Sequence, residues 1–88
     1  MSKSKIEKYV IERVKDKRIA SGFSQAYLAD LIDVTPGFIG KAESPKYLTK
    51  YNLNHINKLA IIFNCSPQEF LPVKPENENE HKKDNKRV

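Results

Sequence analysis

The sequence predicts an all-α fold, in which residues 1–72 form a compact five-helix domain and residues 73–88 form a disordered charged tail. Apolar residues recur at helical spacing along the predicted domain. At four places a capping residue is preceded by an apolar residue and followed four positions later by another, an arrangement called the hydrophobic staple. Residues 74–87 contain no hydrophobic side chain and carry both charges, which is typical of disorder.

Composition limits the classes of protein to consider. The chain has 88 residues, which is typical of one domain, and its formal net charge of +5 permits phosphate binding without requiring it. Cys65 is the only cysteine, which excludes an intramolecular disulfide and a cysteine cluster for metal. The longest apolar run, residues 59–63, is too short to span a bilayer, and no leader pattern opens the chain. We therefore expect a cytoplasmic protein with no membrane segment.

The first helix is expected to begin after Ser4, because Ser4 and Glu7 have the spacing of a capping box. It should end near Ser21 and Gly22, since glycine readily adopts the left-handed backbone that follows a helix. Its apolar stripe consists of Ile6, Val10 and Val14, flanked by Ile11 and Ile19.

Residues 24–43 read as two short helices joined by a tight turn. Their apolar faces consist of Leu28, Ala29 and Ile32 in the first helix and of Ile39 and Ala42 in the second. Asp33 tolerates the left-handed backbone that ends a helix abruptly. Thr35 is the expected N-cap of the second helix, and Pro36 suits its first position because the missing N–H costs nothing there. So short a connection predicts a sharp corner, as in a helix-turn-helix.

Two further helices are expected. The fourth covers residues 53–63 after the N-cap Asn52, and Asn64 is its expected left-handed stop. Its predicted buried face consists of Leu53, Ile56, Leu59, Ala60 and Phe63. The fifth follows the N-cap Ser66, with Pro67 at its first position and Glu69 completing a capping box.

Residues 24–43, together with residues 13–19, 22–25 and 64–71, resemble the lambdoid phage repressor and Cro family of XRE-like helix-turn-helix domains. The resemblance covers about residues 6–72. It implies a five-helix domain of the phage repressor type, whose third helix enters the major groove of double-stranded DNA. It also implies a transcriptional regulator, a repressor that binds operator DNA as a homodimer. The region of the fifth helix with Phe70, Leu71 and Val73 is our candidate for the dimer surface.

The resemblance carries site residues onto this sequence. Gln25, at the start of the second helix, matches a glutamine that binds one phosphate, and Thr35 and Phe38 match positions that touch the DNA backbone. In the following loop, Lys46 and Lys50 are the phosphate candidates, and Ser44 belongs to the same site. The resemblance also pairs Arg18, near the end of the first helix, with Glu43, at the end of the third, in a partly buried salt bridge.

The groove-facing positions of the third helix depart from the family pattern. They are Pro36, Gly37, Gly40 and Lys41. Only Lys41 has a side-chain donor that can reach guanine O6 or N7. Either specificity is low and depends on DNA shape, or the small side chains let the helix sit deeper in the groove. The two glycines weaken the helix, which suggests close approach to another group, with DNA as one candidate.

The sequence also bears on two other function classes. An antitoxin-like or accessory protein of the same fold, whose main partner is another protein, is motivated by the weak set of base-reading residues. An enzyme is not expected, because His55 and His81 are the only histidines and no nucleophile motif, carboxylate pair or phosphate-binding glycine loop appears. No cofactor and no metal site is predicted.

Overall fold

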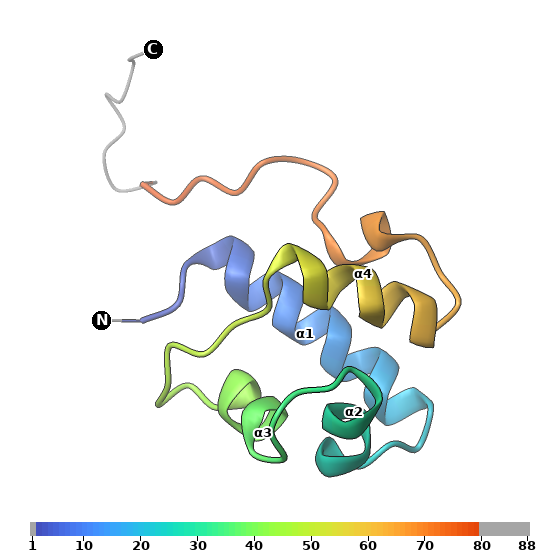
Figure 1. The fold of residues 1–88 in the computed structure, drawn as a ribbon. Coiled ribbons are helices and arrows are strands. Elements are labelled where there is room, and N and C mark those ends of the chain that lie inside the picture. Colours follow the sequence, from blue (N-terminus) through green and yellow to red (C-terminus); the bar gives the residue numbers. More distant parts are fainter. Residues whose placement is uncertain (1, 80–88) are drawn as a thin grey trace.

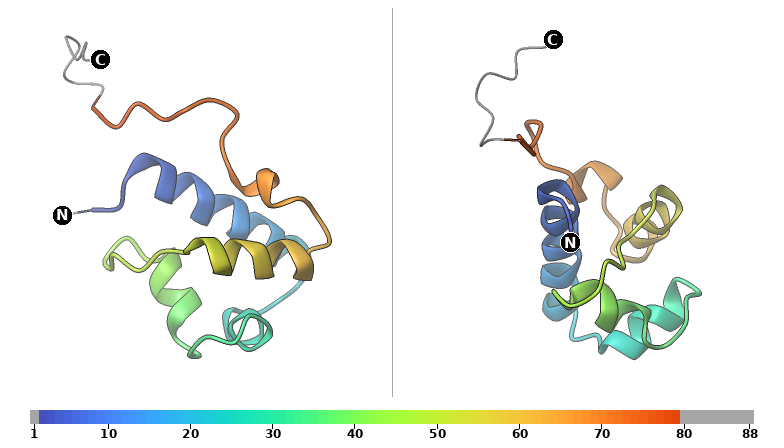
Figure 2. Two further views of the ribbon diagram at one scale, coloured as in Figure 1. Left: turned by 45° about the horizontal axis from the view of Figure 1, so that its top comes forward. Right: turned by 90° about the vertical axis from the view of Figure 1, so that its left-hand side faces the viewer.

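The computed structural model describes residues 2–79, so predictions about residues 80–88 lie outside the described residues. The described chain is all helical, as predicted, with no strand (Figure 1). Its elements are α1 (Lys5–Ala20), α2 (Gln25–Leu31), α3 (Phe38–Glu43), α4 (Leu53–Ile62) and a single 3₁₀ helix, η1 (Pro67–Phe70). The long α1 contacts both α3 and η1, and α2 packs on α3. Two further views show α2 and α3 gathered beside one end of the molecule (Figure 2).

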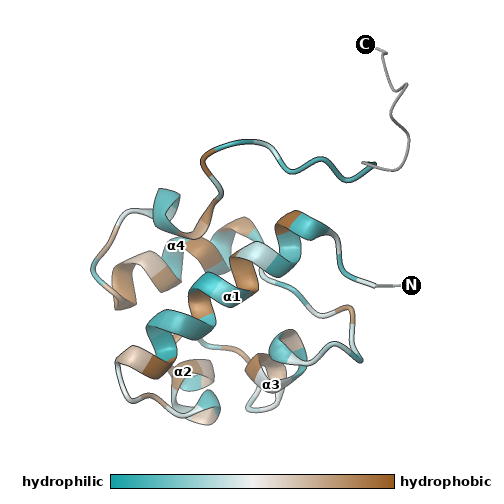
Figure 3. Cartoon of the chain, turned by 180° about the vertical axis from the view of Figure 1, so that it is seen from behind, coloured by the Kyte–Doolittle hydropathy of each residue, from teal (hydrophilic) through white to brown (hydrophobic). Residues whose placement is uncertain are grey.

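The core lies where the inner faces of these helices meet. Its largest fully buried side chains are Phe70, Leu28, Ile32, Ile39, Leu59 and Val14. Along α1 and α4, hydrophobic positions alternate with hydrophilic ones as expected for helices with one buried face (Figure 3). Each large apolar side chain removed from water contributes about 1.5–3 kcal/mol before the entropy of ordering is subtracted. Leu28, Ile32 and Ile39 belong to the α2–α3 corner, so their burial in the core stabilises that corner.

Helix starts follow the predicted caps at α1, α2 and α4. Ser4 and Glu7 form a complete capping box at α1, and the Ser24 hydroxyl accepts a hydrogen bond from Tyr27 N–H at α2. At α4 the Asn52 side chain accepts from His55 N–H, and His55 Nδ1 accepts from Asn52 N–H. His55 therefore completes a second capping box that sequence reasoning missed.

The predicted left-handed residues are also present. Gly22, Asp33 and Asn64 have φ values of 73°, 62° and 53°. Each follows the end of a helix, where this backbone turns the chain away from the helix axis. Local sequence thus determines where α1, α2 and α4 stop.

The predicted start of α3 is wrong by two residues. We expected Thr35 as N-cap and Pro36 at the first helical position, whereas the N-cap is Gly37, with no side-chain cap. The reason is a tight turn: Phe38 N–H donates to the Thr35 carbonyl at 3.0 Å, and α-helical bonding begins only with Lys41 N–H to Gly37. Residues 35–38 therefore form a turn before the helix proper starts, and the backbone of Gly37 in it is in the ordinary right-handed region.

Three predictions for the last two helices also need correction. Leu53 is 82% exposed, because it is the first residue of α4 and lies beyond the edge of the core. Phe63 caps α4 and is not part of it. The fifth helix is a single 3₁₀ turn. The predicted capping box does not form there, because the Glu69 carboxylate pairs with Lys17 of α1 at 3.0 Å.

After η1 the described chain runs without helix or strand toward the N-terminal end of α1 (Figure 1). There the Glu78 carboxylate accepts hydrogen bonds from Lys5 N–H at 2.8 Å and from Ile6 N–H at 3.1 Å. Both N–H groups lack partners within the helix, and a carboxylate suits the positive end of the helix dipole. Within residues 2–79 no helix is long and apolar enough to cross a membrane.

Candidate nucleic-acid interface

The corner between α2 and α3 is fixed by backbone contacts. Val34 N–H donates to the Ala29 carbonyl at 3.0 Å, and Asp33 N–H donates to the Asp30 carbonyl at 3.2 Å. Ala29 is 1% exposed, and its small side chain permits the close approach of the two helices. The corner predicted from residues 24–43 is therefore present, with a later start for α3.

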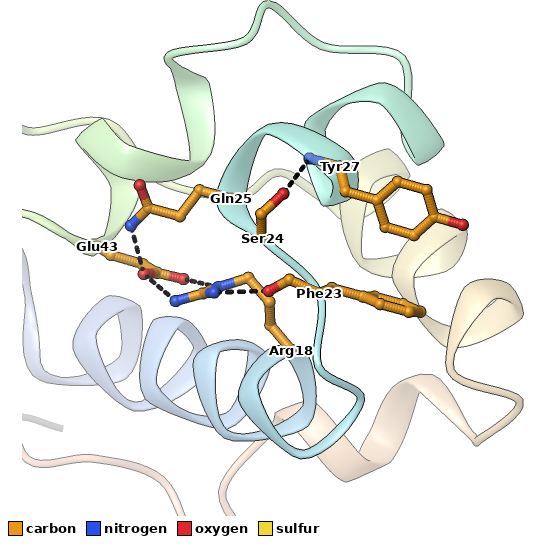
Figure 4. Close-up of polar contacts among 6 residues, drawn as sticks. All are labelled: Arg18, Phe23, Ser24, Gln25, Tyr27 and Glu43. Atoms are coloured by element: carbon orange, nitrogen blue, oxygen red, sulfur yellow. Dashed lines mark hydrogen bonds and ion pairs between the residues drawn. The ribbon is translucent and has the colours of Figure 1, made fainter.

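Arg18 and Glu43 join α1 to the end of α3 (Figure 4). Arg18 Nε donates to Glu43 Oε2 and Arg18 Nη2 donates to Glu43 Oε1, both at 2.9 Å. Arg18 Nη1 also donates to the Phe23 carbonyl at 2.8 Å, just before α2. The side chains are 12% and 5% exposed, so this bidentate pair is largely shielded from water. One guanidinium thus links α1, the start of α2 and the end of α3.

Gln25 is tied to the same carboxylate. Its Nε2 donates to Glu43 Oε1 at 2.9 Å, and its amide oxygen points away from Glu43 (Figure 4). A Cβ added at Gly40 would lie 3.1 Å from Gln25 Oε1. The group that closely approaches α3 at Gly40 is therefore Gln25, which sequence reasoning did not consider.

The outer side of α3 carries one cation. Lys41 is exposed, and its ammonium lies 5.6 Å from the centroid of the Tyr47 ring, within range of a cation–π contact. Gly37 has open space where a side chain would be. Pro36 and Thr35 are exposed in the turn before the helix.

Phe38 is half-buried and turns toward the start of α4. Its ring centroid lies 5.0 Å from that of His55 and 6.0 Å from that of Tyr51. Burial, together with the charge of Glu43, raises the pKa of Tyr51, and its hydroxyl has no hydrogen-bond partner among the described residues. The pKa of His55 is lowered, mainly by burial and to a lesser extent by the charge of Lys58. Phe38 therefore serves the packing of the domain.

The loop after α3 holds the predicted phosphate candidates in different environments. Lys46 is exposed, and its backbone N–H donates to the Ser44 hydroxyl at 3.1 Å. Lys50 is also exposed, but its ammonium lies 3.3 Å from Glu7 Oε2 of α1. Lys46 thus faces solvent directly, whereas Lys50 already has an acidic neighbour.

Lys3 is the residue at this interface that sequence reasoning missed. It is only 9% exposed, and its ammonium donates to the carbonyls of Lys41, Ala42 and Ser44 at 3.4, 2.5 and 2.8 Å. Burial lowers the pKa of Lys3, and the charge of Glu7 partly opposes that shift. The contact spans 38–41 residues of sequence, so no local pattern announces it.

Metal chemistry finds no support in residues 2–79, where no group of three His, Cys, Asp or Glu side chains is placed to hold a metal ion. Cys65 is a free thiol that packs, half-buried, against the core.

No family model matches the sequence, and no curated protein matches it significantly. Among solved structures, the restriction-modification controller protein C.AhdI from Aeromonas hydrophila is similar, with 28% identity and a TM-score of 0.61. The match covers 73% of this chain and 94% of C.AhdI.

Two other solved structures are similar in fold alone. The hypothetical transcription factor NHTF from Neisseria has 15% identity and a TM-score of 0.64, over 90% of this chain and 83% of that one. Hydroxypropylphosphonic acid epoxidase from S. wedmorenis has 22% identity and a TM-score of 0.66, over 78% of this chain but 36% of the enzyme. This chain therefore shares its all-helical fold with a restriction-modification controller, a hypothetical transcription factor and one part of an enzyme.

Proposed function

We propose that this protein is a sequence-specific DNA-binding transcriptional regulator and acts as a repressor. Residues 1–72 form its DNA-binding domain, which is of the lambdoid phage repressor and Cro type. It binds operator DNA as a homodimer, with α3 in the major groove. The observation that carries this proposal is the α2–α3 corner, in which Gln25 is held against α3 by Glu43 at 2.9 Å. The likeness to a restriction-modification controller over 94% of that protein's length supports it.

Gln25 suits a phosphate contact because its amide group has two N–H donors. Glu43 takes one of them, which leaves the other for a phosphate oxygen. The carboxylate of Glu43 would repel a phosphate, but the bidentate contact with Arg18 neutralises its charge. The hydrogen bond to Glu43 restricts the Gln25 side chain before DNA arrives, which would lower the entropy cost of association.

Base reading falls chiefly to Lys41, which is exposed on α3. Gly37 has open space around it, so DNA can approach the helix backbone there more closely than at a residue with a side chain. The remaining residues proposed for the DNA-binding surface lie on α3 or just before it: Thr35 and Pro36 in the preceding turn, and Gly40 beside Gln25. Phe38 is half-buried and contributes at most apolar contact. Specificity then depends on one lysine and on DNA shape.

The loop after α3 supplies phosphate contacts. Lys46 is available without rearrangement, whereas Lys50 must exchange its 3.3 Å contact with Glu7 for a phosphate. Ser44 orders the loop by accepting from Lys46 N–H. Contacts of this kind position the protein on the duplex and make its affinity depend on salt.

Homodimer formation has a candidate surface near the start of α4 and the end of η1. Leu53 and Leu71 line a groove of about 260 Å³ and are 82% and 42% exposed, and Val73 is 98% exposed. Phe70, expected in this surface, is fully buried and supports it from the core. Two half-sites about one helical turn apart would match such a dimer.

Selection from a pool of random duplexes, followed by sequencing of the bound fraction, tests the proposal. A motif with two-fold symmetry is the expected result, and sedimentation of the complex should give two chains per duplex. No enriched sequence, or an asymmetric motif bound by one chain, contradicts the dimeric operator reader.

A second candidate is an antitoxin-like or accessory protein whose main partner is another protein. It is favoured by the absence of base-reading side chains at Pro36, Gly37 and Gly40. The fold also occurs in one part of an enzyme, so fold alone does not establish DNA binding. A pull-down from native cytosol that returns one protein in stoichiometric amount, combined with no enriched duplex, would favour this candidate.

A further inference from the structure

The end of α3 depends on a contact from the N-terminal segment. α3 has six residues, and its N-cap Gly37 makes no side-chain cap. Helices shorter than about 12 residues are marginal in isolation, and the glycine at position 40 weakens this one further. Its order must therefore come from neighbouring groups.

Lys3 supplies that order at the C-terminal turn. An ammonium has three N–H donors, and three carbonyls, those of Lys41, Ala42 and Ser44, converge on this one. The last carbonyls of a helix lack partners within it, and a cation also suits the negative end of the helix dipole. Lys3 is 9% exposed, so its charge lies inside the fold and away from solvent.

The anchor of Lys3 is itself rigid. The next residue, Ser4, is fixed by the capping box of α1, in which Glu7 N–H donates to the Ser4 hydroxyl at 3.2 Å and Ser4 N–H donates to the Glu7 carboxylate at 2.9 Å. The start of α1 and the end of α3 are thus joined through Lys3 and the capped residue that follows it.

We propose that Lys3 is a positioning residue for DNA recognition, which holds the last turn of α3 and the start of the next loop in their binding arrangement. This inference rests on the proposed function of α3. The backbone that Lys3 holds belongs to Lys41, the base-reading candidate, and to Ser44, which orders the loop that carries Lys46. Lys3 acts through these residues and makes no phosphate contact, because its donors are already used.

The test compares the full-length chain with Lys3→Met, Lys3→Arg and the control Lys8→Met, which removes an exposed lysine from α1. Two quantities are measured: amide hydrogen exchange of Lys41 and Ser44 against Phe63 at the end of α4, and affinity for the duplex selected by the wild type across a salt series.

We expect Lys3→Met to speed exchange at Lys41 and Ser44 and to weaken duplex binding about tenfold, the size of one lost charged contact. Exchange at Phe63 and the slope of affinity against salt should not change. Lys3→Arg should restore both quantities to within about threefold, and Lys8→Met should behave as the wild type.

Unchanged exchange at Lys41 and Ser44, or equal affinity for Lys3→Met and Lys8→Met, overturns the proposal. A salt slope reduced by about one would instead make Lys3 a phosphate contact, which also overturns it. Should Lys3→Met unfold, the milder Lys3→Gln, which keeps two N–H donors, must show a partial loss of protection confined to α3. If the wild type selects no duplex, the proposed function fails by itself, and the exchange data still decide whether Lys3 holds α3.

Discussion

Gln25 and Glu43 are joined by a hydrogen bond of 2.9 Å, so the first residue of α2 is held against the last residue of α3. The same carboxylate receives the guanidinium of Arg18 from α1. Three helices therefore meet at one acidic side chain that is 5% exposed. The stability of the domain and the orientation of its candidate interface depend on the same group.

Glu43→Gln should lower the free energy of unfolding by about 3 kcal/mol, because it leaves the charge of Arg18 buried without compensation. The melting temperature should then fall by about 12 °C or more, measured by circular dichroism. The matched control is Asp16→Asn, which breaks an Arg13–Asp16 pair whose side chains are 37% and 63% exposed. That exposed pair contributes at most about 1 kcal/mol, so equal effects of the two variants would refute the structural role of the buried pair.

Gly40→Ala tests the contact between Gln25 and α3. Alanine favours a helix by about 1 kcal/mol over glycine, but its Cβ would meet Gln25 Oε1 at 3.1 Å. We expect the full gain in stability only in the Gln25→Ala background, and a smaller gain in the wild type. Chemical denaturation of the four proteins in this double-mutant cycle measures the difference. Equal gains in both backgrounds would show that Gln25 does not lie against Gly40 in solution.

Acidification should destabilise the protein through His55. Its folded-state pKa lies below the ordinary value of 6.5, because burial and Lys58 disfavour the charged ring. The unfolded chain therefore takes up the proton first, and the stability that neutral His55 contributes is lost as the pH falls from 6.5 through the folded-state pKa.

His55→Gln is the control for that pH dependence, because glutamine can complete the capping box with Asn52 without titrating. The difference in unfolding free energy between the two proteins should be constant above pH 7 and change below pH 6.5. A pH-independent difference would mean that burial and Lys58 do not disfavour the charged ring of His55 in the folded protein.

Lys41 and Lys46 should affect DNA binding differently. Lys41→Ala should cost about 1–3 kcal/mol and relax the preference at one base pair, as expected for a side chain that reads a guanine. Lys46→Ala should weaken binding to all sequences alike and lower the salt slope by about one. Competition among duplexes with single base changes separates the two effects. The roles must be reassigned if Lys46→Ala changes the sequence preference or Lys41→Ala does not.

Local signals in the sequence predicted much of the fold. Caps at Ser4, Ser24 and Asn52, and left-handed stops at Asp33 and Asn64, depend on residues within four positions of one another. Such contacts can be predicted from the sequence because both partners lie close together in it. The start of α3 was missed because Pro36 suits the first position of a helix and suits equally well the tight turn of residues 35–38 that forms instead.

Contacts between distant segments could not be predicted in the same way. Lys3 reaches carbonyls about 40 residues away, and any lysine near the N-terminus looks alike in the sequence. Gln25 was expected to bind a phosphate, and its hydrogen bond to Glu43 was not foreseen, because the packing of α2 on α3 is what brings the two side chains together. Likewise, the exposure of Leu53 depends on where the core ends, which helical periodicity does not reveal.

The most direct test of the central claim is the affinity of the wild-type protein for random duplexes, measured by fluorescence anisotropy across a salt series. We expect binding at low salt, with an affinity whose logarithm falls linearly with the logarithm of the salt concentration and that is reduced by Gln25→Ala. The control Gln68→Ala, an exposed glutamine on η1, should leave binding unchanged. Undetectable binding at low salt would contradict the account and turn the search toward a protein partner.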